Sequence, residues 1–154
     1  MKSVAFDFDG VIHTDVSNTD SNGNRHPTIP FSEVGRNKFD YIIDLIHRYH
    51  RHNYKIYIVT ARSSKSKHVV RNTLTKFNVS PCIIPDENLF FTGDYGRGGD
   101  KVDTLEHLNI NHFYDDSISH FKSIYSAKKQ NRLGNLRKCY LTKPEKNTVI
   151  KLDI

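Results

Sequence analysis

The sequence predicts an α/β fold with a central, mostly parallel sheet of about five strands and helices on both faces. Short runs rich in β-branched and aromatic residues alternate with longer segments whose apolar residues recur at helical spacing. Strands that alternate with helices are joined by right-handed crossovers, so the sheet is parallel and covered on both faces. The 154 residues contain no repeat, which indicates one domain over 1–154.

The N-terminal third is predicted to contain the first strand, a small flap and the first helix. Residues 2–8 form an apolar run that is typical of a buried strand. Residues 14–30 are polar and rich in turn residues, which predicts a loop or small hairpin, a flap of about 13–30. From about Phe31 to His52 apolar residues follow helical spacing, and Ser32 is placed to cap that helix.

This first helix is predicted to end in a histidine cluster of unassigned role, His47, His50 and His52. His47 and His50 could share a helical face and bind a metal, but no further ligands accompany them. Cations near a helix C-terminus interact favourably with the helix dipole, and this interpretation is favoured.

The middle of the chain continues the alternation of strands and helices. Residues 54–60 predict a strand and residues 64–77 an amphipathic helix. A third strand is expected at 82–84 or at 89–92. The glycine-rich loop that follows, 93–100, lacks the Gly-Lys-Ser/Thr ending of a P-loop.

The last third is predicted to add two helices and two strands. They are a short helix with Val102, Leu105 and Leu108, a strand over 112–115, a helix over 117–132 and a strand over 136–141. Gly134 is expected to stop the second helix. The residues of that helix expected to face the core are Ile118, Phe121, Ile124 and Tyr125.

Composition indicates a soluble, intracellular and therefore cytoplasmic protein. Hydrophobic residues make up 36% and charged residues 26%, and no apolar run is long enough to cross a bilayer. The chain begins Met1-Lys2-Ser3 and enters a strand, unlike a secretory signal. Cys82 and Cys139 are predicted to be buried free thiols.

The formal net charge of +6 is unevenly distributed. Nine Lys or Arg residues lie between Lys122 and Lys151, where the only acid is Glu145. A second acid-free cluster comprises Arg62, Lys65, Lys67, Arg71 and Lys76. Such clusters are often solvated helix faces, but they also favour phosphate-rich partners.

Two carboxylates stand near the start of the chain, where an apolar run meets Gly10. Alternation along a strand would send Asp7 and Asp9 to one face and Phe6 and Phe8 to the other. The alternative is a simple Asp-Gly turn. Function gathers at the carboxyl ends of parallel strands, which favours an active site.

Four motifs in order make the chain resemble the haloacid dehalogenase superfamily of phosphohydrolases, in a nearly capless form. They are Asp7-Phe8-Asp9-Gly10-Val11, Thr60 after Ile56-Tyr57-Ile58-Val59, Lys101 in Gly99-Asp100-Lys101, and Asp115-Asp116 after His112-Phe113-Tyr114. The resemblance covers residue 4 to about residue 141. It implies a three-layer Rossmann-like fold and a phosphatase.

The resemblance implies Mg²⁺ as cofactor. Asp7 and Asp115 would supply carboxylate ligands and Asp9 its main-chain carbonyl, with Asp116 bracing the site directly or through water. Asp7 would attack phosphorus and form an aspartyl-phosphate. Asp9 would act as general acid and then as base, which requires a pKa raised towards neutrality.

The same resemblance assigns Thr60 and Lys101 to the non-bridging phosphoryl oxygens, with Ala61 and Arg62 as further phosphate-binding residues. Dehalogenation also uses an aspartate nucleophile in this superfamily. A second acid at Asp9 favours phosphoryl transfer, because an alkoxide leaving group needs a proton and a halide does not.

Substrate choice in this superfamily depends on caps, and here both possible insertions are small. An open site and a basic surface favour nucleotides or phosphorylated nucleic-acid ends as the phosphorylated substrate, without a membrane partner. Phosphoproteins, small phosphorylated metabolites, and a non-catalytic basic nucleic-acid-binding module are the alternatives.

Overall fold

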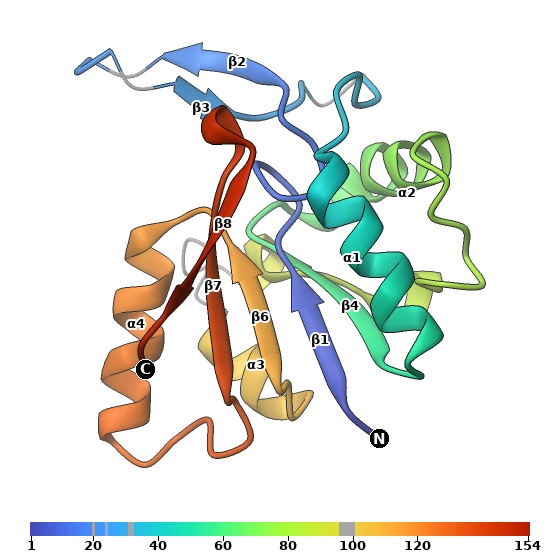
Figure 1. Ribbon diagram of the computed structural model, residues 1–154. Helices are drawn as coiled ribbons and strands as arrows, with labels where there is room; N and C mark the ends of the chain where they lie inside the picture. The colour runs from blue at the N-terminus through green and yellow to red at the C-terminus, as the bar shows by residue number, and fades with distance from the viewer. Residues whose placement is uncertain (20, 24, 31–32, 96–100) are drawn as a thin grey trace.

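The computed structural model describes residues 1–19, 21–23, 25–30, 33–95 and 101–154. Six strands form a single sheet in the order β5-β4-β1-β6-β7-β8 (Figure 1). The strands are β1 (Ser3–Phe6), β4 (Lys55–Thr60), β5 (Leu89–Phe91), β6 (His112–Asp115), β7 (Lys138–Lys143) and β8 (Thr148–Leu152). All neighbours are parallel except β7 and β8. The predicted α/β class is confirmed.

The central strand β1 is paired on both sides, and its register brings three strand ends together. Phe6 lies opposite Ile58 of β4 and opposite Tyr114 of β6. Asp7 follows β1 directly, while Thr60 and Asp115 are the last residues of β4 and β6. Parallel register therefore gathers these polar residues at one edge of the sheet.

Helices cover both faces of the sheet and give the fold three layers (Figure 1). The helices are α1 (Asp40–Arg51), α2 (Lys67–Lys76), α3 (Val102–His107) and α4 (Ile118–Lys129). Side chains of β1 alternate between two hydrophobic clusters. Val4 and Phe6 join the cluster that contains residues of α1 and α2, and Ala5 joins the one with residues of α3 and α4. Short 3₁₀ turns occupy Ser64–Ser66, Asp86–Asn88, Thr92–Tyr95 and Pro144–Lys146.

The expected flap is an antiparallel hairpin of β2 (Val16–Thr19) and β3 (Arg25–Pro27). It lies beyond the carboxyl end of the central strands, separate from the main sheet (Figure 1). The chain returns from it through Thr28 and Ile29 towards α1. The hairpin therefore stands beside the edge where the polar residues gather.

Several predicted boundaries differ from the structure. The first helix begins at Asp40 rather than near Phe31, because residues 33–38 run irregularly and Phe39 occupies the N-cap with its side chain buried. Ser32 lies outside the described residues. The third strand is Leu89–Phe91, and residues 82–84 form a turn.

The last helix also differs from its prediction. It ends at Lys129, and Asn131 and Leu133 with positive φ reverse the chain before Gly134 is reached. Phe121 and Ile124 are buried, but Ile118 and Tyr125 are 51% and 49% exposed, so these two do not face the core. The edge strand β8 was not predicted from the sequence.

The two cysteines are free, as predicted, but only Cys139 is buried, and Cys82 is exposed because its segment is a surface turn. Among the described residues, no helix is both long and apolar enough to span a membrane.

Candidate active site

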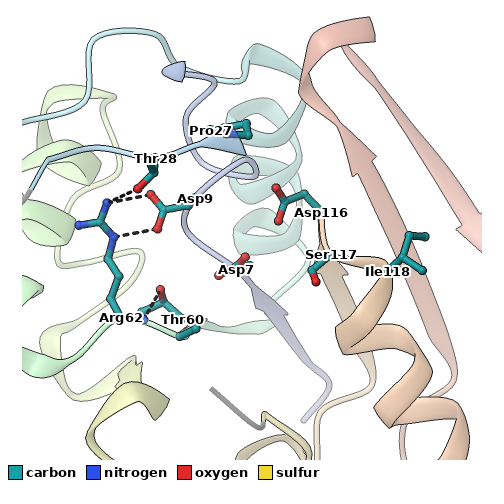
Figure 2. Close-up of a pocket in the computed structure, with 10 residues that line it drawn as sticks. Asp7, Asp9, Pro27, Thr28, Thr60, Arg62, Asp116, Ser117 and Ile118 are labelled. Carbon is teal, nitrogen blue, oxygen red and sulfur yellow. Dashed lines mark hydrogen bonds and ion pairs between the residues drawn. The ribbon is translucent and has the colours of Figure 1, made fainter. Parts of the chain in front are cut away.

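A cavity of about 550 Å³ opens at the carboxyl edge of the sheet (Figure 2). Six predicted site residues line it: Asp7, Asp9, Thr60, Ala61, Arg62 and Asp116. Pro27 and Thr28 from the flap side, and Ser117 and Ile118 from the start of α4, complete the wall. The other two predicted residues, Lys101 and Asp115, are buried directly behind Asp7.

Asp7 is held rigidly at the end of β1. Its N–H donates to the carbonyl of Tyr114 at 2.9 Å, which continues the pairing of β1 with β6. Its Oδ1 accepts from the N–H of Phe8 at 2.8 Å and from Nζ of Lys101 at 2.9 Å. Within the described part of the chain, Oδ2 has no hydrogen-bond partner, so this oxygen is available for chemistry.

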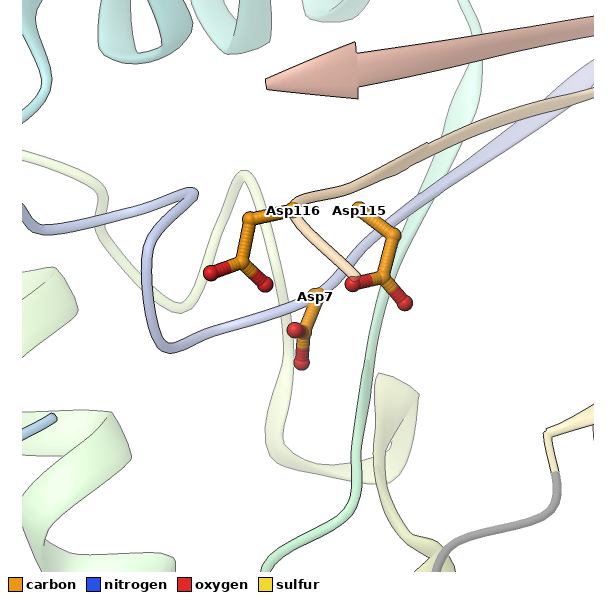
Figure 3. A group of neighbouring side chains, drawn as sticks. All are labelled: Asp7, Asp115 and Asp116. Carbon is orange, nitrogen blue, oxygen red and sulfur yellow. The ribbon is translucent and has the colours of Figure 1, made fainter. Parts of the chain in front are cut away.

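Three carboxylates meet at this point and form a candidate metal centre. Asp7, Asp115 and Asp116 each offer a ligand oxygen, and these atoms all lie within 4.8 Å of one another (Figure 3). Burial and then the charge of Asp115 raise the pKa of Asp7 well above its ordinary value. The same two causes raise the pKa of Asp116 to about 7. Clustered, buried carboxylate oxygens of this kind fit a hard divalent cation.

Lys101 neutralises part of this negative charge. It is 3% exposed, and its Nζ lies 2.9 Å from Asp7 and 2.9 Å from Asp115. Burial alone would lower its pKa, but the two carboxylates outweigh that effect and raise the pKa. The ammonium is therefore charged and fixed between two acids.

Asp115 has further partners that the sequence did not suggest. Its Oδ2 accepts from Nδ1 of His120 at 2.6 Å as well as from Lys101, and its Oδ1 accepts from the N–H of Ser117 at 3.0 Å. Burial would raise the pKa of Asp115, but Lys101 and His120 hold it well below its ordinary value. The available signal was a histidine in the first turn of the helix that follows Asp115.

Asp9 lies in a turn beyond the strand. The strand ends at Phe6, and the N–H groups of Val11 and Ile12 both donate to the carbonyl of Phe8. Asp9 nevertheless lines the same cavity as Asp7. An Asp-Gly turn is therefore present and still brings Asp9 to the cavity that Asp7 lines, and simple strand alternation does not extend to Asp9.

The Asp9 carboxylate is bound by His13 and Arg62. His13 Nδ1 accepts from the N–H of Asp15, so its Nε2 carries the proton and donates to Asp9 Oδ1 at 2.8 Å. Burial would raise the pKa of Asp9, but the hydrogen bonds from His13 and Arg62 outweigh burial and lower the pKa. The predicted rise towards neutrality is thus wrong for this arrangement, because the prediction did not include these two donors.

The loop after β4 forms another wall of the cavity. Thr60 is 1% exposed, and its Oγ1 accepts from the N–H of Arg62 at 3.2 Å. Gly93 approaches this loop so closely that an added Cβ would lie 2.5 Å from the carbonyl oxygen of Ala61. Only glycine allows that approach, which fixes the position of Ala61 and Arg62.

Gly10 plays a comparable part on the opposite wall. Its φ of +76° belongs to the left-handed region, and a Cβ would collide with Oδ2 of Asp116. Its carbonyl accepts from Oγ1 of Thr142 at 3.0 Å, which ties the turn to the end of β7. The absence of a Cβ at Gly10 therefore allows the Asp116 carboxylate to lie directly against the turn.

Comparison with known proteins gives one family. The model of a family described as 5'-nucleotidase matches residues 3–134. An uncharacterized protein of Acanthamoeba polyphaga mimivirus is 36% identical over 146 residues, which are 94% of this chain and 28% of that protein. The chain thus spans little more than a quarter of the length of this curated relative.

Two solved structures are similar at lower identity. A proposed 3-deoxy-D-manno-octulosonate 8-phosphate phosphatase from Vibrio cholerae is 17% identical, with a TM-score of 0.43 over 81% of this chain and 61% of that chain. A hypothetical protein from Pyrococcus horikoshii OT3 is 15% identical, with a TM-score of 0.38 over 90% and 41% of the respective chains.

Proposed function

Because this chain belongs to the 5'-nucleotidase family, within the haloacid dehalogenase type of phosphoric monoester hydrolase, we propose a Mg²⁺-dependent mechanism through an aspartyl-phosphate. One observation carries the proposal: Asp7 keeps its Oδ2 without a partner among the described residues, beside two further acids and a buried lysine. A carboxylate with one oxygen fixed and the other available is suited to nucleophilic attack.

The metal would be held by the carboxylates of Asp7, Asp115 and Asp116, together with the main-chain carbonyl of Asp9. When bound, Mg²⁺ supplies positive charge that offsets the repulsion between the carboxylate nucleophile and an anionic phosphate. Hard oxygen donors of this kind match the preference of Mg²⁺. Lys101 adds a second positive charge on the buried side of Asp7.

In the first half of the reaction, Oδ2 of Asp7 forms a bond to phosphorus while the bond from phosphorus to the ester oxygen breaks. The leaving oxygen keeps the bonding electron pair and takes a proton from Asp9. Because Asp9 has a lowered pKa before substrate binds, its protonated form must be acquired as the phosphate dianion enters. The product is an aspartyl-phosphate on Asp7 and a free alcohol.

In the second half, Asp9 accepts a proton from water, and the water oxygen bonds to phosphorus. The bond between phosphorus and Asp7 breaks, inorganic phosphate leaves, and the Asp7 carboxylate is restored. Thr60 would donate its hydroxyl to a non-bridging oxygen and Lys101 would balance charge there, with Ala61 as a further residue of the cavity wall.

For the substrate we propose a nucleotide or a phosphorylated nucleic-acid end. The family match supports a nucleotide. The small flap leaves the cavity accessible, and the exposed Lys65 and Lys67 follow the loop that carries Arg62, which supports an extended polyanion. Phosphoproteins and small phosphorylated metabolites remain in the test as competing substrates.

The test measures the release of phosphate from a nucleotide and from a phosphorylated oligonucleotide by the wild type and by Asp7→Asn, with Mg²⁺ and with EDTA. Asp44→Asn, on the exposed face of α1, is the matched control for loss of one carboxylate. We expect release only by the wild type and the control, and only with Mg²⁺. Turnover that is unaffected by both Asp7→Asn and EDTA would refute the mechanism.

Substrate class needs a separate panel of mononucleotides, oligonucleotides phosphorylated at the 3′ or the 5′ end, sugar phosphates and phosphopeptides. We expect the highest kcat/KM on a nucleotide or an oligonucleotide end. If sugar phosphates or phosphopeptides turn over while both nucleotide classes are inert, the proposed substrate class is wrong.

A further inference from the structure

Arg62 was predicted to bind phosphate, yet its guanidinium is already surrounded by protein acceptors. Nε donates to Oδ2 of Asp9 at 2.8 Å, and Nη2 donates to Oδ1 of the same carboxylate at 2.9 Å (Figure 2). The guanidinium carbon also lies 5.3 Å from the centre of the Phe8 ring. With its side chain only 12% exposed, Arg62 is held in one place by contacts on several sides.

The same guanidinium reaches the chain that leaves the flap. Nη2 donates to the main-chain carbonyl of Ile29 at 2.5 Å and lies 3.4 Å from the hydroxyl of Thr28. Thr28 lines the cavity. Arg62 therefore connects three segments that are far apart in the sequence: the turn after β1, the loop after β4 and the exit from β3.

The hydrogen bonds leave the two oxygens of Asp9 in different states. Oδ1 accepts from His13 Nε2 and from Arg62 Nη2, and two donors are the usual capacity of a carboxylate oxygen. Oδ2 accepts only from Arg62 Nε within the described residues, so one lone pair remains. Only Oδ2 can hold a proton without losing one of these bonds.

We propose that Arg62 is a positioning residue, which orients Asp9 so that its Oδ2 exchanges the proton with the leaving oxygen. The same guanidinium anchors the chain that leaves the flap, at Thr28 and Ile29. This inference rests on the proposed phosphatase function. Arg62 touches neither phosphorus nor the metal in this assignment. It acts through Asp9, and its two parallel N–H bonds are a geometry that lysine cannot reproduce.

The proposal predicts a loss that depends on the leaving group. An alkoxide must be protonated as it departs, whereas 4-nitrophenolate leaves as a stable anion and needs little help from Asp9. In a double-displacement reaction, kcat/KM reports the steps up to departure of the leaving group, so later hydrolysis of the aspartyl-phosphate does not mask the effect. A purely structural role would lower kcat/KM for both kinds of ester alike.

The experiment compares 4-nitrobenzyl phosphate with 4-nitrophenyl phosphate, which have similar rings but an alkoxide and a phenolate as leaving groups. For Arg62→Ala we expect kcat/KM to fall by about 10²-fold on the benzyl ester and by less than about tenfold on the phenyl ester. Arg62→Lys keeps the charge and should show the same selective loss. Asp9→Asn provides the reference pattern for loss of the acid itself.

Arg71→Ala is the matched control. Arg71 has the same kind of partners at a site remote from the cavity, with Nε on the carboxylate of Asp86 at 2.7 Å and Nη2 on the carbonyl of Ile84 at 2.5 Å. Its removal should leave the ratio of the two kcat/KM values unchanged. Thermal unfolding of each variant shows whether it is folded, and Arg62→Lys decides the question if Arg62→Ala is not.

The outcomes separate the two proposals. Equal losses on both esters, or no loss, in a folded Arg62 variant would overturn the positioning role, even if Asp9→Asn keeps its selective loss. If the wild type hydrolyses neither ester with Mg²⁺ and releases no phosphate from the substrate panel, the proposed function fails and this inference fails with it.

Discussion

Replacing Asp116 with asparagine should stabilise the metal-free protein. Asp116 shares a site with Asp7 and Asp115, and its pKa is raised from 3.8 to about 7 by burial and by the charge of Asp115. The folded state therefore disfavours the ionised form of this residue. Asparagine has nearly the same shape but carries no charge, so it removes the repulsion between Asp116 and Asp115 and the cost of burying an ionised carboxylate.

The size of the effect follows from the shift. A rise from 3.8 to about 7 corresponds to at most about 4 kcal/mol of unfolding free energy above neutral pH. The amide still loses hydration on burial, so we expect Asp116→Asn to gain about 2 kcal/mol. In a chain of 154 residues this raises the melting temperature by roughly 4–8 °C.

The dependence on pH identifies the cause. A group with a raised folded pKa contributes stability that is complete below its unfolded value of 3.8 and is lost as pH rises through about 7. The difference between variant and wild type should thus be small near pH 4 and complete near pH 8. Thermal unfolding in EDTA across this range measures it, with the exposed Asp44→Asn as control, expected within about 0.5 kcal/mol of wild type.

Magnesium should reverse the order. Wild type gains about 2.7 kcal/mol when free Mg²⁺ is a hundred times its dissociation constant, and Asp116→Asn should gain less because one ligand charge is gone. The reasoning is refuted if Asp116→Asn is no more stable than wild type in EDTA at pH 8, or if its advantage is the same at every pH. Either result would show that repulsion at Asp116 does not limit stability.

Two further predictions follow from close contacts and from burial. Gly10→Ala should remove most of the stabilisation by Mg²⁺ and most activity, because its Cβ would displace Asp116. A Cβ on Gly134 meets nothing within 4 Å, so the control Gly134→Ala should bind Mg²⁺ normally. A calorimetric Mg²⁺ titration compares the two variants, and equal affinities would contradict the steric argument. In the native protein, a thiol reagent should label Cys82 rapidly and Cys139 only on unfolding. Cys139 is buried, and burial raises its thiol pKa to about 12. Labelling is followed by mass spectrometry, and fast labelling of Cys139 would contradict its burial in the core.

The strands that carry the site were predictable because each combines a strong local pattern with a clear end. The apolar runs before Asp7, Thr60 and Asp115 are short, rich in β-branched or aromatic residues, and stop at a polar residue. Parallel pairing then places their ends together. The meeting of Asp7, Asp115 and Asp116 thus follows from strand ends and topology, without knowledge of any side-chain contact.

Elements whose limits depend on tertiary packing were less predictable. Phe39 fits the helical spacing of α1, yet it serves as the N-cap, because its side chain is buried in the core while the chain before it follows the flap. The edge strand β8 is half exposed and short, and it exists through its antiparallel pairing with β7. Ile118 follows the apolar period of α4 but lines the cavity instead.

The partners of Asp9 show a limit of a different kind. Arg62 lies 53 positions away in the sequence, and its contact with Asp9 depends on how the loop after β4 turns over Gly93. Strand alternation placed Asp9 beside Asp7, but the structure brings it there by a turn in which Gly10 has positive φ. That turn also directs the Asp9 carboxylate towards Arg62 and His13. The Asp-Gly turn therefore gives Asp9 different neighbours from those of Asp7. Two acids one residue apart then have pKa values shifted in opposite directions, raised for Asp7 by burial and Asp115 and lowered for Asp9 by its two donors. The proposed roles need the reverse, an ionised Asp7 and a protonated Asp9, so the positive charge of a bound Mg²⁺ and the negative charge of the incoming phosphate would have to shift both groups.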